Sequence, residues 1–162
     1  MEMIPNEKKG TTEMRILRRI PLAVFALLST VLFFQGAPVS AQIPAYLNAL
    51  SNLRAARACV QSDNRPTFRV HMKIATNEMD KAINDLKTAV KLAGANPYQT
   101  PPPQNAGDVN GNIHQALQLL HDARSNIEHE ADPPGYPGLQ ANSLRHIEAA
   151  RHELQQIVDN VQ

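Results

Sequence analysis

The sequence predicts an all-α protein, an antiparallel four-helix bundle made of two duplicated helical hairpins. The main observation is a nine-residue pattern, small-[LI]-x-x-[LI]-x-x-Ala-[Arg/Val], that occurs four times in the 162 residues. Its apolar positions recur every three or four residues, as in an amphipathic helix. Because each helix has a single apolar face, it needs neighbours to bury that face, and a bundle supplies them. The copies are ALSNLRAAR from Ala49, AINDLKTAV from Ala82, ALQLLHDAR from Ala116 and SLRHIEAAR from Ser143.

The repeat extends beyond single helices. Aligning the first copy of the pattern with the third also places Val60 on Ile127 and Pro66 on Pro133. Each pair of helices is joined by a short connection that contains proline, which makes the two helices antiparallel neighbours. The chain therefore predicts two copies of one hairpin.

Breaks between the patterns set the expected helix ends. Pro44 suits the first turn of the first helix, where its missing N–H costs nothing. Thr67 is the expected N-cap of the second helix, and Gly94 is expected to end it. The segment from about residue 95 to about residue 110 is too rich in proline to be helical, and it is long enough to join the hairpins. The helices are expected at about 44–62, 68–93, 112–130 and 139–160.

The inward face of each expected helix follows from its period of 3.6 residues. By the same projection Cys59 points away from the first of these faces, and His129 and His146 point outward. The residues expected inside are Tyr46, Leu50, Leu53, Val60, Phe68, Met72, Ala75, Met79, Ile83, Leu86, Val90, Ala93, Ile113, Leu117, Leu120, Ile127, Leu144, Ile147, Leu154, Val158 and Val161.

Residues 1–41 have the features of a cleaved signal peptide. Three arginines between residues 15 and 19 precede an uncharged apolar run at 20–34, and the small residues at 39–41 fit a signal peptidase. The run is shorter than the roughly 20 residues of a membrane-spanning helix. We therefore expect cleavage before Gln42 and an exported protein, periplasmic or secreted, with no membrane attachment after cleavage.

The bundle domain is expected to comprise residues 42–162. Met14 directly precedes the basic region of the signal peptide and offers an alternative start of translation. The domain carries 11 Lys and Arg and 12 Asp and Glu, so its net charge is −1 with neutral histidines, and it lacks tryptophan. Such a composition has neither the positive charge nor the stacking aromatic side chains of a nucleic-acid-binding protein.

The chain has one cysteine, Cys59, so an internal disulfide is excluded. The fold must therefore be held together by its core. Cys59 is expected to have no specific role. The alternative is a disulfide that joins two copies of the chain as a homodimer.

Arginine occupies the last position of the pattern in three of the four helices. This position lies within the apolar stripe, which is unusual for a charged side chain. We expect Arg57, Arg124 and Arg151 to lay their aliphatic stems along the edge of the core and to pair with Asp or Glu. The alternative is a semi-buried cluster that binds an anion.

All six histidines lie in residues 42–162. None of the spacings that put two imidazoles on one helical face occurs, such as His-x-x-x-His. If the third and fourth helices are antiparallel, however, His121, Glu148 and His152 lie at similar height on facing flanks. Such a set suits a divalent transition ion, Cu, Ni or Zn, bound with low affinity.

No catalytic motif is present. The sequence lacks G-x-S-x-G, and no histidine is placed near Cys59 by spacing. We therefore expect no enzymatic activity.

The stretch YLNALSNLRAAR from Tyr46 resembles a Y-L-x-A-L-S-x-L-R-x-A-R motif of small exported bacterial helical-bundle proteins of uncharacterised activity. The resemblance extends through EMDKAINDLKTA, HQALQLL and RHIEAAR. It implies a helical bundle and no particular activity. A more distant likeness is to small periplasmic metal-binding proteins built from helical repeats, which are far richer in histidine.

These observations favour a non-enzymatic structural or protein-interaction module. Its partner is expected to be a protein, bound through the polar faces or through Tyr98 and Pro101–Pro103. The first alternative is low-affinity metal binding or buffering. The second is a carrier of an apolar ligand, which requires an internal cavity. That cavity is expected among Leu117, Leu120, Ile147 and Leu154.

Overall fold

The computed structural model describes residues 39–103 and 111–161. In these residues it contains four α-helices, one short 3-10 helix and no strand, which confirms the predicted all-α class. The predicted signal peptide lies outside the described residues except for 39–41, as does the part of the proline-rich connection at 104–110. The elements are α1 (Val39–Ser62), η2 (Pro66–Phe68), α2 (Arg69–Leu92), α3 (Asn112–Ile127) and α4 (Leu139–Asp159).

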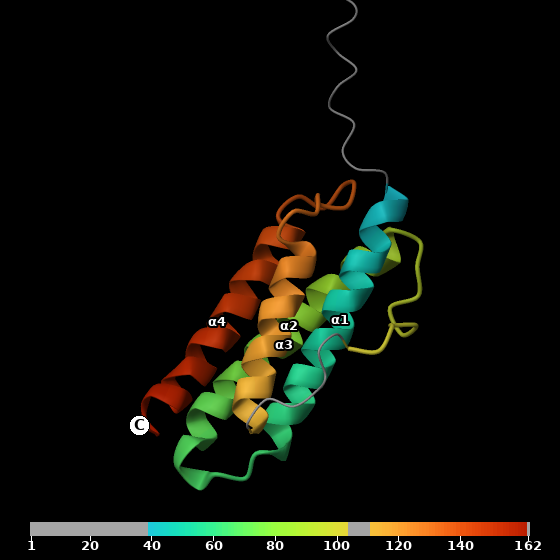
Figure 1. The fold of residues 1–162 in the computed structure, drawn as a ribbon. Coiled ribbons are helices and arrows are strands. Elements are labelled where there is room, and N and C mark those ends of the chain that lie inside the picture. The colour runs from blue at the N-terminus through green and yellow to red at the C-terminus, as the bar shows by residue number, and fades with distance from the viewer. Residues whose placement is uncertain (1–38, 104–110, 162) are drawn as a thin grey trace, which may run out of the picture. The chain divides into compact units, whose positions relative to one another are not determined.

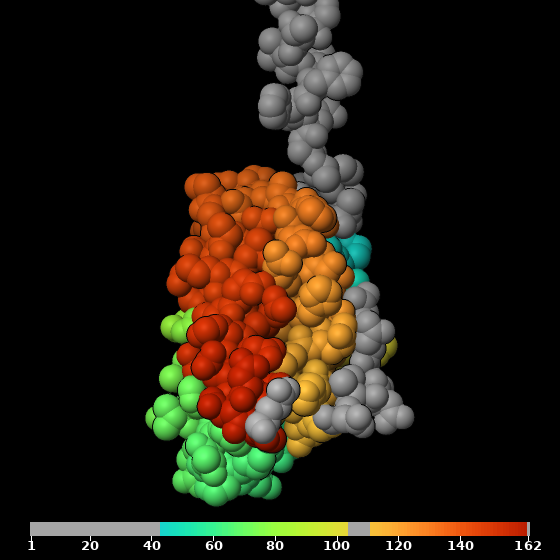
Figure 2. Space-filling model, turned by 60° about the vertical axis from the view of Figure 1, so that its left-hand side comes forward, coloured from blue at the N-terminus to red at the C-terminus, as the bar shows by residue number. Residues whose placement is uncertain are grey.

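Each α-helix packs against two others. Both α1 and α4 contact α2 and α3, so α1 and α4 occupy opposite corners of the bundle. In Figure 1, α1 and α4 run in one direction and α2 and α3 in the other, so every packed pair is antiparallel. Figure 2 shows the surfaces of α3 and α4 meeting along a continuous boundary. α2 ends and α3 begins at opposite ends of the bundle (Figure 1), as in bundles with one long crossover connection.

One apolar core occupies the centre of the bundle. The first, fifth and eighth positions of the nine-residue pattern are buried in all four helices. Ser143 is the only polar side chain among them, and its hydroxyl donates to the carbonyl oxygen of Leu139 at 3.0 Å. The buried set is Ala49, Leu53, Ala56, Ala82, Leu86, Ala89, Ala116, Leu120, Ala123, Ser143, Ile147 and Ala150.

Several side chains differ from their predicted positions. Leu119 and Ile157 were not predicted inside, yet both are completely buried, whereas Leu117 is only partly buried. The reason is that each helix contacts two neighbours, so its buried arc is wider than one stripe. Val161 was expected inside and is 58 % exposed, because α4 ends two residues before it. His146, expected outside, is buried.

Three predicted helix ends are also wrong. α1 begins at Val39, so Pro44 lies inside the helix and not at its start. Thr67 lies within η2, and Phe68 caps α2 without a side-chain hydrogen bond. α3 ends at Ile127, three residues earlier than expected.

Gly94 ends α2 as predicted. Its φ of 79° lies in the left-handed region that favours glycine. The N–H of Gly94 donates to the Lys91 carbonyl oxygen and the N–H of Ala95 donates to that of Val90, both at 3.0 Å. This pair of bonds is the Schellman motif, which satisfies carbonyl groups that the helix end would leave unpaired.

The connection between α3 and α4 is held by hydrogen bonds to the start of α4 and to α1. The carboxylate of Asp132 accepts hydrogen bonds from the N–H groups of Gly138 at 2.6 Å and Gln140 at 2.7 Å, so it caps the positive end of α4. On the other side, the hydroxyl of Tyr46 in α1 donates to the Ala131 carbonyl oxygen at 2.6 Å. Burial, followed by the nearby charge of Asp132, raises the pKa of Tyr46 to about 12.

No helix in the described part of the chain is long and apolar enough to cross a membrane.

Replacing Leu119 by alanine is expected to lower the free energy of unfolding by about 2–5 kcal/mol, because a completely buried leucine leaves a cavity when it is truncated. The matched control is Leu117→Ala in the same helix, which removes a partly buried side chain and should cost less. Urea unfolding followed by circular dichroism measures both losses. Equal losses in the two variants would contradict the burial seen in the structure.

Candidate functional site

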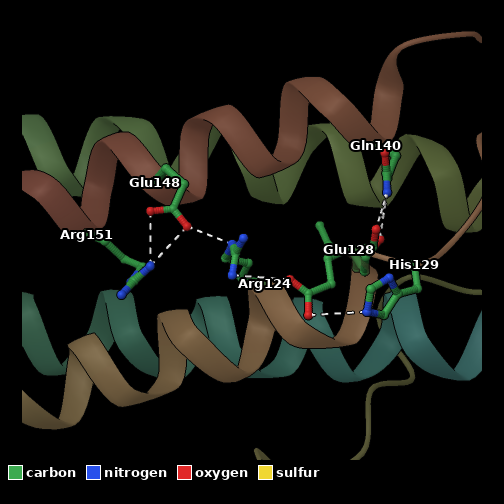
Figure 3. A network of polar contacts seen from close by, with 7 residues as sticks. Arg124, Glu128, His129, Gln140, Glu148 and Arg151 are labelled. Atoms are coloured by element: carbon green, nitrogen blue, oxygen red, sulfur yellow. Dashed lines mark hydrogen bonds and ion pairs between the residues drawn. The ribbon is translucent and has the colours of Figure 1, made fainter.

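The residues of the predicted metal site do not form a group of ligands. His121 and His152 are exposed on α3 and α4. The carboxylate of Glu148 binds two arginines, with Arg124 Nε at 2.8 Å and Arg151 Nη1 at 3.0 Å (Figure 3). Nowhere in residues 39–103 and 111–161 do three or more His, Cys, Asp or Glu side chains lie close enough together to hold a metal ion. This arrangement gives no support to metal binding at His121, Glu148 and His152, which is left to experiment.

The contacts around Arg124 continue towards the end of α3. Arg124 Nη1 lies 3.2 Å from Glu128 Oε2, and Glu128 Oε1 lies 3.5 Å from His129 Nε2 (Figure 3). Gln140 at the start of α4 donates to the carbonyl oxygens of Ile127 at 3.0 Å and Glu128 at 3.1 Å. These contacts join the last turn of α3 to the first turn of α4. Because their side chains are partly exposed, each ion pair contributes about 1 kcal/mol or less to stability.

The arginines of the pattern lie where the first interpretation placed them. Arg57 Nε of α1 lies 2.7 Å from Asp80 Oδ1 of α2, while Arg124 and Arg151 share the carboxylate of Glu148. All three are partly exposed and each pairs with a carboxylate, which confirms the expected pairing with Asp or Glu. The alternative, a cluster that binds an anion, is not assembled among the described residues, since the three charges are each held by a carboxylate.

A second set of ionisable side chains lies between α2 and α4, and it was not predicted from the sequence. His71 Nδ1 of α2 lies 2.9 Å from Glu153 Oε2 of α4. One heptad away, His146 Nδ1 of α4 lies 2.5 Å from Glu78 Oε2 of α2. Asp85 follows on α2 after a further seven residues. We call these five residues, His71, Glu78, Asp85, His146 and Glu153, the polar seam.

The polar seam has a signal in the sequence. Residues 71, 78 and 85 are spaced by seven, as are 146 and 153, and a spacing of seven keeps side chains on one face of a helix. Acid and base alternate between the two helices at matching heights. The side chain of His146 is only 11 % exposed, so its predicted outward direction was wrong. The prediction considered a single apolar stripe on α4, and His146 lies beside that stripe, where α4 meets α2.

The two carboxylates nearest His146 have opposite electrostatic surroundings. The hydrogen bond from Lys81, at 2.6 Å, and then that from His146 hold the pKa of Glu78 below its ordinary value. Burial raises the pKa of Asp85, although the charges of His146 and Arg145 oppose this effect. Asp85 Oδ2 is buried and receives no hydrogen bond from the residues that the structure describes.

A different kind of surface surrounds Tyr98, in the connection after α2. The Tyr98 side chain is 70 % exposed. The guanidinium carbon of Arg54 from α1 lies 5.9 Å from the centre of its ring, and the Nζ of Lys87 from α2 lies 5.8 Å from it. Lys91 lies one turn beyond Lys87 and is exposed. We call Arg54, Lys87, Lys91 and Tyr98 the Tyr98 surface.

The segment that carries Tyr98 is bound to α1 by hydrogen bonds. Arg54 donates to the carbonyl oxygen of Pro97 at 2.9 Å and to the hydroxyl of Thr100 at 3.4 Å. The hydroxyl of Ser51 donates to the carbonyl oxygen of Pro101 at 2.6 Å. Pro97 is buried, while Tyr98, Pro101 and Pro102 are exposed. The segment therefore presents these side chains from a fixed position.

Cys59 does not point away from the core as predicted. It is partly buried and packs against the core. Burial raises the pKa of its thiol, which disfavours the reactive thiolate. Whether Cys59 joins two copies stays a prediction.

The residues expected to line an apolar cavity belong to the packed core, and Leu117 lies partly buried against it. Leu120, Ile147 and Leu154 are completely buried in the core. A cavity of about 520 Å³ lies elsewhere, at the end of the bundle where α1 and α4 end and α3 begins, and its lining includes charged side chains such as Asp63 and Arg65. These two already pair with each other at 2.8 Å.

No family model matches the chain, and the comparisons with curated proteins and with solved structures give no match.

Calorimetric titration with Zn(II), Cu(II) and Ni(II) tests the metal prediction. We expect no saturable heat that depends on the two histidines, because Glu148 is held by two arginines. The double variant His121→Ala/His152→Ala is the control. Stoichiometric binding that this variant loses would instead establish the site.

Proposed function

We propose that this protein is an exported, non-enzymatic interaction module that binds an acidic segment of a partner protein through the Tyr98 surface. The observation that carries the proposal is an exposed tyrosine held between cations from two different helices. Tyrosine is among the residues that contribute most to protein interfaces, because its ring is large and its hydroxyl remains hydrogen-bonded.

Preorganisation supports the proposal. Binding costs free energy when a mobile segment must be ordered. Here the hydrogen bonds from Arg54 and Ser51 hold the segment around Tyr98 on α1 before any partner arrives. Residues 97–101 are thus suited to act as a rigid contact.

Charge supports an acidic partner. Within the part of the chain that the structure describes, no ion pair with a carboxylate involves Arg54, Lys87 or Lys91. Complementary charge guides encounter and selects partners. A segment of a partner with carboxylates around an apolar or proline side chain fits this combination of cations and an exposed ring.

Export is part of the proposal. Cleavage before Gln42 would remove the first three residues of α1 and leave Pro44 in the first turn of the shortened helix. In the first turn the missing N–H of proline costs nothing, whereas inside a helix proline removes a hydrogen bond. The position of Pro44 is therefore better suited to a chain that begins at Gln42.

Duplication of a hairpin is also proposed as the origin of the bundle. Support comes from equivalent positions in α1 and α3: Tyr46 and Ile113, Val60 and Ile127 are buried pairs, each 67 residues apart. Arg57 and Arg124 share this separation, and each pairs with a carboxylate of the following helix.

Photocrosslinking tests the binding surface. A photoreactive amino acid is placed at position 98 or, as the matched control, at position 136, since Tyr136 is another exposed tyrosine in a connection. The probe is a short labelled peptide of alternating Glu and Leu residues. We expect it to crosslink at position 98 and not at 136, and to bind about fivefold more weakly to a Lys87→Glu variant, because one surface charge pair is worth about 1 kcal/mol.

A peptide of alternating Lys and Leu residues is the control for non-specific hydrophobic binding. Equal crosslinking of the two peptides, or of positions 98 and 136, would overturn the proposal.

A further inference from the structure

The connection between α3 and α4 carries an exposed tyrosine among carboxylates. Glu128, Glu130 and Asp132 lie in it, and no lysine or arginine occurs from residue 125 to residue 144. Glu128 pairs with Arg124, whereas Glu130 forms no ion pair with any residue that the structure describes. The side chain of Tyr136 is 50 % exposed. We call Glu128, Glu130, Asp132 and Tyr136 the acidic connection.

The backbone of the acidic connection is ordered without a partner. The N–H of Tyr136 donates to the Pro133 carbonyl oxygen at 3.1 Å. Gly135, the third residue of this turn, has a φ of 82°, as a type II β-turn requires. Besides burial, the charges of Asp132 and Glu130 raise the pKa of Tyr46, as a negative potential does. The connection therefore presents an aromatic ring and negative charge from a fixed position.

The Tyr98 surface has the opposite charge. Its three cations, Arg54, Lys87 and Lys91, equal in number the three carboxylates of the acidic connection. No aspartate or glutamate occurs from residue 42 to residue 62 or from residue 86 to residue 107, the parts of the chain that carry this surface. Positive and negative charge are thus separated between the two surfaces, and such complementary surfaces attract each other.

We propose that a second copy of this chain is a partner of the Tyr98 surface, and that the segment bound there is the second copy's acidic connection. This inference rests on the proposed function, because it names the partner. An occupant of the Tyr98 surface needs carboxylates beside an apolar or proline side chain. Glu130, followed by the exposed Pro134 and Tyr136, meets this requirement.

The arrangement of the two surfaces suits a twofold dimer. In Figure 1, α2 ends at the same end of the bundle as the connection between α3 and α4. Within one copy both rings stay open, with Tyr98 70 % and Tyr136 50 % exposed. A twofold axis lets each copy offer its acidic connection to the other's Tyr98 surface, so that the same contact forms twice. Such a pairing uses both surfaces and closes after two copies.

Sedimentation equilibrium of the purified protein tests the pairing. We expect the mean mass to rise from that of one copy to that of two across about 1 µM to about 1 mM, the range of weak complexes. Raising the salt concentration is expected to lower the dimer fraction, because exposed charges are screened. The mass of a single copy throughout this range would overturn the proposal.

A charge exchange identifies the surfaces that pair. Lys87→Glu and Glu130→Lys are each expected to raise the dissociation constant about 25-fold, since the twofold pairing loses about fivefold at each of two contacts. The double variant Lys87→Glu/Glu130→Lys restores the attraction with its sign reversed, and its dissociation constant should return to within about fivefold of the original. Lys73→Glu is the matched control, because Lys73 is exposed near the other end of α2, and it should leave the dimer unchanged.

Crosslinking locates the contact directly. A photoreactive amino acid at position 98 should join two copies, and mass spectrometry should find the joined peptide among residues 128–138 of the second copy. A dimer that survives Lys87→Glu, or a double variant no better than the single ones, would refute the pairing. If the Glu and Leu peptide crosslinks at position 98 while the protein stays a single copy, the proposed function holds and the self-pairing is wrong.

Discussion

The fold depends on one packing constraint: three positions in each helix, at spacings of four and three residues, must be buried at once. In α1 these positions are Ala49, Leu53 and Ala56, and the same small, large, small order recurs in α2 and α3, with Ser143 replacing the first alanine in α4. Small residues let two neighbouring helices approach closely, and the large residue between them fills the centre. Polar connections, ion pairs and exposed surfaces are all arranged around this shared core.

α1 has a second role, because it holds both of the longer connections. Tyr46 binds the connection before α4, while Ser51 and Arg54 bind the connection after α2. Apolar side chains of α1 lie in the core, and its polar groups hydrogen-bond to the irregular backbone of the two connections. Tyr98 is consequently positioned by helix residues that hydrogen-bond to partners 43 to 50 residues further along the chain.

Periodicity predicted the class, the approximate helices and most of the core, since the pattern directly encodes burial. It did not predict which side of the apolar stripe is also buried by a second neighbouring helix, because this depends on how the helices are arranged. Leu119 and His146 both lie on such flanks, at the fourth position of the pattern, and both were misplaced. The seven-residue spacing of His71 and Glu78 could have indicated the polar seam. That spacing is informative, however, only once α2 and α4 are known to be in contact. For Glu148 the predicted position was right, because it lies between α3 and α4. Its predicted partners were wrong, because its carboxylate binds Arg124 and Arg151.

The order in which helices neighbour one another has a consequence for folding. Contacts of α1 with α3 and of α2 with α4 are more extensive than those within either hairpin, although these partners are separated by the long crossover. A single hairpin would leave the larger part of its apolar surface in water. Each hairpin is therefore stabilised mainly by its contacts with the other hairpin. The chain must close its longest loop before most of the core forms. Loop closure is an entropic cost that precedes the gain from burial, so this bundle combines helical local structure with the slower, more cooperative assembly typical of non-local topologies.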